Sequence, residues 1–176
     1  MQGAFTGKYL RVNLSTGTTS TEEFPALTYR LFMGGAAMAA HLLVKELRPG
    51  VDPLGPDNIM VFATCPLNGI PLAGASRFSV ATKSPLTGGY GEGEAGGWWG
   101  PELKFAGFDG IIVTGQASKP VYLWICDGQV EFGPPITSGA SSPARCRTRS
   151  RPRRRSEHAC CSAGLPGKKA ISWPTS

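Results

Sequence analysis

The side chains with the clearest capacity for binding chemistry lie between residues 77 and 99. Arg77 follows the small-residue stretch AGAS at the start of a predicted strand, where its guanidinium offers a rigid fork of donors to phosphate or another planar anion. A surface arginine in a salt bridge is the alternative. Lys83 contacts a phosphate or is simply solvated, and solvation is favoured. The pair Trp98-Trp99 either covers a large flat ligand or packs in the core, and core packing is favoured.

A glycine-rich stretch, Gly91-Glu92-Gly93-Glu94-Ala95-Gly96, matches the pattern GxGxxG. A dinucleotide fingerprint needs a strand that leads directly into the first glycine and an acidic residue about 20 positions later. Here a long stretch separates the preceding strand from the motif, and its two glutamates would repel a pyrophosphate. The stretch is therefore predicted to be a loop whose backbone can approach another ligand closely. A purely structural loop is the alternative.

Other catalytic or metal chemistry is not indicated in residues 1–132. His41 lies on a predicted helix without a cysteine or histidine at ligand spacing. The five cysteines form no CxxC pair, so neither a disulfide framework nor a metal site is predicted. Cys65 and Cys126 are expected to be buried, inert thiols. No nucleophile and base combine into a triad, so no catalytic residue is assigned.

The elements that must position these residues are short. Alternating residues predict a half-buried strand over 8–14, and Asp127-Gly128 predicts a hairpin turn. Residues 84–97 are predicted to be a loop. The other predicted strands cover 59–63, 77–82, 111–115 and 121–125, and the predicted helices cover 36–47 and 97–107. This order favours an α+β fold: a β-rich domain of packed, mostly antiparallel sheets with a few short helices.

Composition narrows the class of protein. The 24 glycines and 15 prolines favour tight turns and argue against a helical bundle. No apolar run approaches the roughly 20 residues that cross a bilayer, and no signal peptide is recognisable. A cytoplasmic protein without a membrane segment is expected.

Residues 133–176 differ sharply from residues 1–132. The first 132 residues carry 9 Lys/Arg against 11 Asp/Glu, and the last 44 carry 9 against 1. Such a tail cannot bury a core. It is a basic disordered arm that would bind nucleic-acid phosphates, the product of a frameshift, or another kind of divergence. A one-base shift of the reading frame permits His-Leu-Trp-Gly and, further on, Gly-Pro-Ala-Gly-Glu-Lys, which favours the frameshift.

The order of several strings resembles the amino-terminal domain of the aldehyde:ferredoxin oxidoreductase family over residues 3–132. The strings are GKYLRVNLSTG, YRLFMGG, PGVDPLGPDN, FATCPLNG, SRFSVATKSPLTGGYG and GGWWGPELKFAGFDGIIVTGQASKPVYLWI. The family continues with an HLWG-like turn and a GPAGE turn, which are the strings that the shifted frame permits. The resemblance implies that residues 1–132 are a truncated, pterin-binding amino-terminal domain.

The resemblance also implies cofactors and a reaction. Two pyranopterin-dithiolene cofactors with a bridging magnesium would hold one tungsten, or molybdenum, on the β-sheets of this domain. A nearby [4Fe–4S] cluster would pass electrons to ferredoxin while an aldehyde and water become a carboxylic acid. The cluster cysteines and acid/base residues would lie in later domains, so this chain alone is expected to be inactive. A homodimer is left open.

Three residues match the family's cofactor contacts by position. Arg77 matches the arginine between pterin and cluster, and Gly96 matches a backbone contact to the pterin. Glu94 falls where the best-known members have an asparagine whose main-chain carbonyl helps to hold the magnesium. An acidic side chain there, beside phosphates, departs from the family's pattern.

Two alternatives stand beside this interpretation. One is a small binding module with a basic arm that binds nucleic acid. The other, within the same superfamily, is a reductase of aromatic thioesters, although KSPLTG and GGWWGPELKFAG resemble the aldehyde enzymes more closely. The segment does not indicate which aldehyde is oxidised or whether the metal is tungsten or molybdenum.

Overall fold

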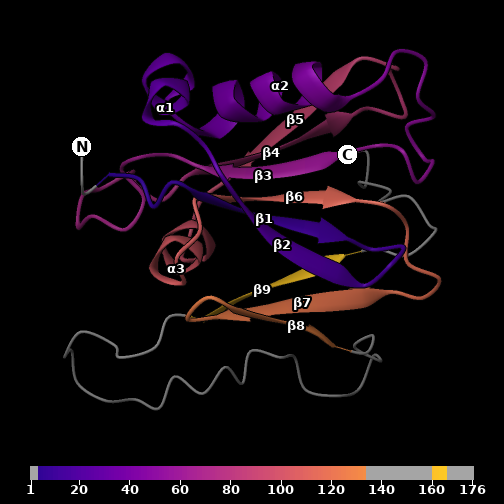
Figure 1. Ribbon diagram of the computed structural model, residues 1–176. Helices are drawn as coiled ribbons and strands as arrows, with labels where there is room; N and C mark the ends of the chain where they lie inside the picture. Colours follow the sequence, from indigo (N-terminus) through magenta and orange to yellow (C-terminus); the bar gives the residue numbers. More distant parts are fainter. Residues whose placement is uncertain (1–3, 134–159, 166–176) are drawn as a thin grey trace, which may run out of the picture.

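The computed structural model describes residues 4–133 and, as backbone only, residues 160–165. Its elements form layers, with α1 and α2 on one face of a large sheet and α3 and a smaller sheet on the other (Figure 1). The helices are α1 (Ala26–Phe32), α2 (Gly35–Glu46) and α3 (Trp99–Phe105). The strands are β1 (Lys8–Asn13), β2 (Thr18–Glu23), β3 (Met60–Thr64), β4 (Phe78–Lys83), β5 (Tyr90–Ala95), β6 (Gly110–Thr114), β7 (Val121–Cys126), β8 (Gln129–Gly133) and β9 (Cys160–Leu165).

The large sheet has the strand order β2-β1-β6-β3-β4-β5. Only β1 and β6 pair in parallel, and the other neighbours are antiparallel. The small sheet, β8-β7-β9, is antiparallel throughout. The predicted fold class, a β-rich α+β domain with mostly antiparallel sheets and a few short helices, is therefore confirmed.

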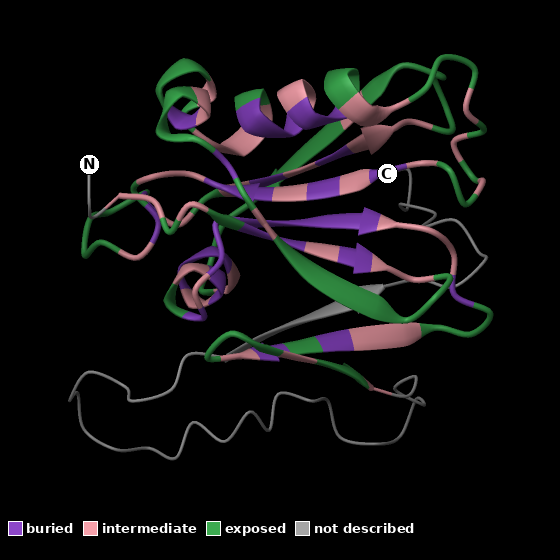
Figure 2. Ribbon diagram, viewed as in Figure 1, coloured by how far each residue is buried: buried purple, intermediate pink, exposed green. Residues whose placement is uncertain are grey.

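The core consists of two apolar clusters, one on each face of the large sheet. Tyr9 packs with α2 residues such as Met38 and Leu42 in one cluster. Leu10 and Val12 pack toward α3 and the small sheet in the other. The interior strands are accordingly purple along most of their length (Figure 2). The predicted strand over 8–14 is confirmed as β1, but it is not half-buried, because a layer covers each of its faces.

The predicted helix 36–47 corresponds to α2, whose buried residues are Met38, Ala39, Leu42 and Leu43. Within the described residues no single helix is long and apolar enough to cross a membrane. One bent pair, α1 with α2 at 113°, passes that test by length and composition.

Both edges of the large sheet differ from the sequence prediction. Residues 84–97 were predicted to be a loop, but β5 forms there and pairs with β4. At the other edge β2, an exposed Thr-rich strand, pairs with β1. An edge strand gains its hydrogen bonds from one neighbour and needs no apolar face, so periodicity does not reveal it.

A buried charged pair anchors the start of the chain. The Asp109 carboxylate is 2% exposed and accepts hydrogen bonds from the backbone N–H of Thr6 and Gly7 at 3.1 and 2.8 Å. Lys104 Nζ lies 3.8 Å from Asp109 Oδ1 and donates to three backbone carbonyls, those of Ala4, Cys65 and Pro66. Burial lowers the pKa of Lys104, although Asp109 opposes that shift. The pair ties residues 4–7 to α3.

The predicted basic tail, residues 133–176, lies outside the described residues except for Gly133 and the backbone of β9. The frameshift, the basic arm and the domain boundary at 132 stay predictions. The cysteine prediction needs correction. Cys65 is free and half-buried, whereas Cys126 is disulfide-bonded. Sequence spacing does not reveal which cysteines the fold brings together.

Candidate functional site

The three residues predicted to bind a cofactor lie together at one end of the β4–β5 ladder. Phe78 pairs with Ala95 and Ser79 pairs with Glu94. Arg77 directly precedes Phe78 and Gly96 directly follows Ala95, so both lie just beyond the last pair of the ladder. Residues 17 positions apart in the chain thus become neighbours. We name this region, residues 76–78 with 94–98, the ladder end. The structure brings Arg77, Glu94 and Gly96 together, and their role with a cofactor stays a prediction.

Arg77 and Glu94 form an ion pair at the ladder end. Arg77 Nη1 donates to Glu94 Oε2 at 2.9 Å, and the two side chains are 71% and 48% exposed. Exposed pairs of this kind contribute about 0–1 kcal/mol to stability. Little free energy is therefore needed to separate them, and the guanidinium can exchange the carboxylate for another anion.

The backbone next to this pair is unusually bare. On the face opposite α2, β5 presents Gly91, Gly93 and Ala95, because Glu92 and Glu94 pair with Ala81 and Ser79 on the α2 face. A methyl group placed at Gly93 would meet no atom within 4 Å, and one at Gly96 would approach only Ser76 Oγ, at 3.8 Å. β5 is also an edge strand. A flat ligand can approach this backbone closely.

The two neighbouring tryptophans have opposite environments. Trp99 packs against Phe78 and Phe62, with ring centroids 4.4 and 5.6 Å away, which confirms the core prediction for this residue. Trp98 is 81% exposed, so the same prediction was wrong for Trp98. Consecutive residues at the start of a short helix point in different directions, and only one of these two rings can face the sheet.

Tyr90 makes a contact between β5 and α2 that the sequence did not predict. Its hydroxyl lies 3.4 Å from the carbonyl oxygen of Ala36, to which it donates, and 3.3 Å from Glu92 Oε2. Burial, and then the negative charge of Glu92, raises the pKa of Tyr90 to about 12. Its hydroxyl is therefore a hydrogen-bond donor at neutral pH and links β5 to α2. The lack of apolar periodicity around residue 90 left no signal for this contact.

Lys83 is not available to a phosphate at the ladder end. It stands at the opposite end of β4, and its Nζ donates to the carbonyl oxygen of Val51 at 2.5 Å. The prediction that Lys83 is simply solvated was also wrong, because the 49–58 turn approaches this strand end.

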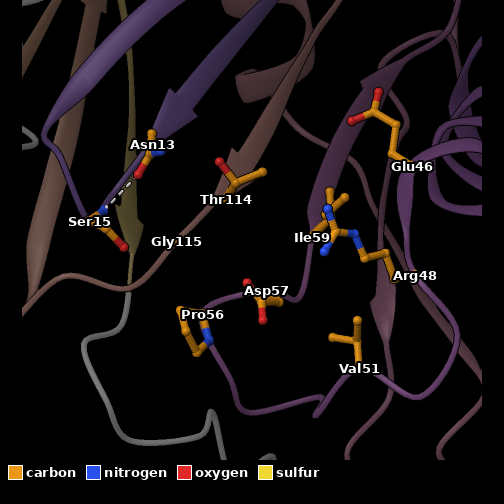
Figure 3. Close-up of a pocket in the computed structure, with 10 residues that line it drawn as sticks. All are labelled: Asn13, Ser15, Glu46, Arg48, Val51, Pro56, Asp57, Ile59, Thr114 and Gly115. Carbon is orange, nitrogen blue, oxygen red and sulfur yellow. Dashed lines mark hydrogen bonds between the residues drawn. The ribbon is translucent and has the colours of Figure 1, made fainter.

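A separate cavity of about 370 Å³ opens at the other end of the large sheet (Figure 3). It lies beyond the carboxyl ends of β1 and β6, whereas the ladder end lies at the amino end of β4, which runs parallel to β6. Arg48 and Asp57 line it without an ion pair to any described residue. The other lining residues are Asn13, Ser15, Glu46, Val51, Pro56, Ile59, Thr114 and Gly115. None of the predicted site residues belongs to this cavity.

Metal ligands are a further point of interest. Within the part of the chain that the structure describes, no group of three or more His, Cys, Asp or Glu could hold a metal ion.

Comparison with known proteins agrees with these features. The family described as "Aldehyde ferredoxin oxidoreductase, N-terminal domain" matches residues 9–168. The tungsten-containing aldehyde ferredoxin oxidoreductases of Pyrococcus furiosus and Thermococcus kodakarensis are each 46% identical over 126 residues, which are 72% of this chain and 21% of the relative. The aliphatic sulfonate oxidoreductase WOR-like subunit of Pyrococcus furiosus is 37% identical over 132 residues, 73% of this chain and 21% of the relative.

A solved structure shares the fold. It is the active site complex BamBC of benzoyl coenzyme A reductase in complex with 1,5-dienoyl-CoA, with a TM-score of 0.72 and 37% sequence identity. The match covers 75% of this chain and 20% of the solved one. The chain thus spans about a fifth of the length of the relatives that it matches.

The family match extends over most of the chain, and the relatives align with the region that contains the ladder end. The layered sheets are therefore a fold shared with the solved structure. The chain belongs to the aldehyde ferredoxin oxidoreductase family, as an N-terminal domain.

Proposed function

We propose that this domain binds a tungsten, or molybdenum, bis-pyranopterin cofactor at the ladder end, as part of an oxidoreductase that converts aldehydes to carboxylic acids. The observation that carries the proposal is the arginine beside a bare glycine backbone. Arg77 and Gly96 offer a cation and unobstructed backbone to one ligand. A phosphorylated, flat heterocycle needs both. Tungsten in the name of the 46% identical relatives supports the choice of cofactor.

Each residue has a defined task in this proposal. Arg77 leaves Glu94 and donates to an anionic or carbonyl group of the pterin. The backbone at Gly96 approaches the pterin because no side chain intervenes. When bound, the metal dithiolene supplies the two-electron redox chemistry, and the protein supplies position and charge.

Glu94 requires a separate account. Its carboxylate would repel pterin phosphates unless a cation lies between them. A bridging magnesium would meet this need, and the main-chain carbonyl of Glu94 is its proposed contact. The carboxylate, released from Arg77, would then face the same cation.

The remaining parts of the reaction are assigned to other regions of the enzyme. Ferredoxin as electron acceptor, an aldehyde as substrate and a [4Fe–4S] cluster belong to this proposal through the family. We assign the cluster ligands and acid/base groups to segments that correspond to the other four-fifths of the relatives. A cytoplasmic location and a homodimer stay predictions.

The nucleic-acid-binding module is not favoured by the comparisons, since every relative named above is an oxidoreductase or a reductase. It rested on the basic tail alone. Sequencing the encoding DNA through codons 133–176 separates the two origins of that tail, because a frameshift requires an open frame that continues in the shifted register.

A chimeric enzyme tests the proposed function directly. Residues 4–133 replace the corresponding segment of the Pyrococcus furiosus aldehyde enzyme, to which this chain is 46% identical. The chimera is produced with tungstate and then assayed for tungsten by mass spectrometry and for pterin by fluorescence after oxidation. We expect both in stoichiometric amounts, together with aldehyde-dependent reduction of ferredoxin.

Two variants of the chimera locate the site. Arg77→Ala should lower the pterin content about tenfold or more, because loss of a hydrogen bond to a charged group costs about 1.5–3 kcal/mol. Arg48→Ala, at the cavity on the opposite end of the sheet, is the matched control and should retain the cofactor. A folded chimera without tungsten and pterin would refute the proposal.

A further inference from the structure

Trp98 is the most exposed aromatic side chain named at the ladder end, at 81%. The backbone on both sides of it passes close to Ser76. A methyl group placed at Gly96 would lie 3.8 Å from Ser76 Oγ, and one at Gly100 would lie 3.2 Å from the Ser76 carbonyl oxygen. Trp98 stands between these two glycines, and Ser76 directly precedes Arg77. The Trp98 backbone therefore lies near Arg77 and Gly96, two of the predicted cofactor contacts.

The local backbone directs this indole away from the protein. Gly97 has φ +96°, a conformation that side-chain-bearing residues rarely adopt, and it turns the chain from β5 into α3. Trp99 then enters the core against Phe62 and Phe78. Because Trp99 occupies the inward position, Trp98 must face outward at the start of the helix.

An indole in this position has a clear use beside Arg77. Large exposed apolar side chains that adjoin polar binding groups commonly mark ligand sites. A tryptophan provides a flat face on which a heteroaromatic ring can stack. We infer that Trp98 is a binding residue that stacks on the pterin ring while Arg77 contacts its anionic groups.

This inference rests on the proposed function and adds to it a second, apolar half of the site. Arg77 recognises charge, and Trp98 recognises the flat ring. The two contributions should therefore separate when the ligand loses its phosphate. A pterin without phosphate keeps the contact with Trp98 and loses the charge that favours Arg77.

The experiment uses the full 176-residue chain and a fluorescent probe, 6-hydroxymethylpterin phosphate. Pterin anisotropy measures binding, with excitation where tryptophan does not absorb. Tryptophan emission reports proximity, because bound pterin quenches a neighbouring indole. Trp98→Ala should weaken binding about tenfold, in line with the loss of one stacked ring, and Trp98→Phe should restore most of the affinity.

The matched control is Trp124→Ala. Trp124 is also exposed, at 40%, but it lies on β7 in the small sheet. This variant should bind the probe as the unchanged chain does and should keep the quenching, whereas Trp98→Ala should lose it. With 6-hydroxymethylpterin, which lacks phosphate, Trp98→Ala should still weaken binding and Arg77→Ala should have little further effect.

The outcomes distinguish the two levels of the proposal. Equal binding and equal quenching in the unchanged chain and Trp98→Ala would overturn the role of Trp98 while the pterin site stands. Absence of binding in both the unchanged chain and the Trp124→Ala control would overturn the proposed function together with this inference.

Discussion

The interior and the β5 edge of the large sheet are built from the same backbone geometry but from opposite kinds of side chain. The strands β1 and β6 are covered on both faces, and residues such as Leu10, Val12 and Ile112 are buried. In β5 almost every residue is exposed, and a methyl group at Gly93 would meet no atom within 4 Å. The interior strands stabilise the domain, whereas β5 adds little apolar burial and leaves its backbone open.

This contrast indicates where a binding site can form in such a domain. Interior positions are constrained by packing, so a change there is expressed as lost stability. Edge positions at the ladder end have few packing partners, so Arg77, Glu94 and Trp98 can be changed at small cost to the fold. The comparison predicts that effects on stability and effects on binding separate between the two regions.

The largest effect on stability is expected for Asp109→Ala. The change leaves the charge of Lys104 and two backbone N–H groups without their carboxylate, and breaking a buried pair costs about 3–5 kcal/mol. Urea unfolding followed by circular dichroism measures it. The exposed pair Lys8–Glu23, at 3.9 Å, provides the control, since Glu23→Ala should cost less than about 1 kcal/mol. Similar losses in both variants would contradict the contrast.

A pair of glycine substitutions compares interior and edge directly. A methyl group at Gly110 in β6 would overlap the Tyr9 ring and the Phe62 carbonyl oxygen, so Gly110→Ala should destabilise the domain by about 1–3 kcal/mol. Gly93→Ala in β5 meets open space and should change the free energy of unfolding by less than about 0.5 kcal/mol. The difference between their urea midpoints is the decisive measurement, and equal midpoints would remove the distinction.

Removal of a buried hydroxyl should sharpen the same comparison. The Tyr9 hydroxyl is buried and has no hydrogen-bond partner among the described residues, so Tyr9→Phe should leave stability unchanged or raise it by up to about 1 kcal/mol. Burial, and then Asp109, raises the pKa of Tyr9. Tyr9 therefore ionises less readily in the folded state than in the unfolded state. Ionisation does not weaken the folded state below about pH 10, and the folded state loses stability as the pH rises further.

The pH dependence of Tyr9→Phe provides the check. Urea midpoints measured at about pH 8 and about pH 11 should fall less in Tyr9→Phe than in the unchanged chain. Tyr90→Phe, on the edge, should have a smaller influence because the pKa of Tyr90 rises only to about 12 and its side chain is half exposed. A larger effect at Tyr90 than at Tyr9 would reverse the assignment of interior and edge.

A small effect on stability, together with a gain in binding, is expected for Glu94→Gln. The Arg77–Glu94 pair is exposed, so the free energy of unfolding should change by less than about 1 kcal/mol. Binding of a pterin phosphate without added magnesium should strengthen, because the variant removes a negative charge and frees the guanidinium. A titration by anisotropy measures this, and weaker binding by Glu94→Gln would show that the carboxylate does not compete for Arg77.

Prediction from sequence succeeded where a residue's environment follows from its neighbours along the chain. Asp127 and Gly128 have φ values of 47° and 80°, as the predicted hairpin turn requires, and β3, β4, β6 and β7 lie within a residue or two of their predicted ranges. It failed for β2 and β5, whose exposed residues carry no alternation. It also failed for Trp98 and for Cys126, whose environments depend on packing between distant segments.

The sequence by itself determined the interior strands, the turns, the α+β class and the identity of Arg77, Glu94 and Gly96 as residues worth testing. Only the tertiary structure decided that β5 is an edge strand, that Arg77 meets Glu94 and that one of two adjacent tryptophans is left in solvent. The reason is physical. Apolar periodicity and turn conformations are local properties, whereas an ion pair across a ladder and the exposure of a ring depend on which strands become neighbours.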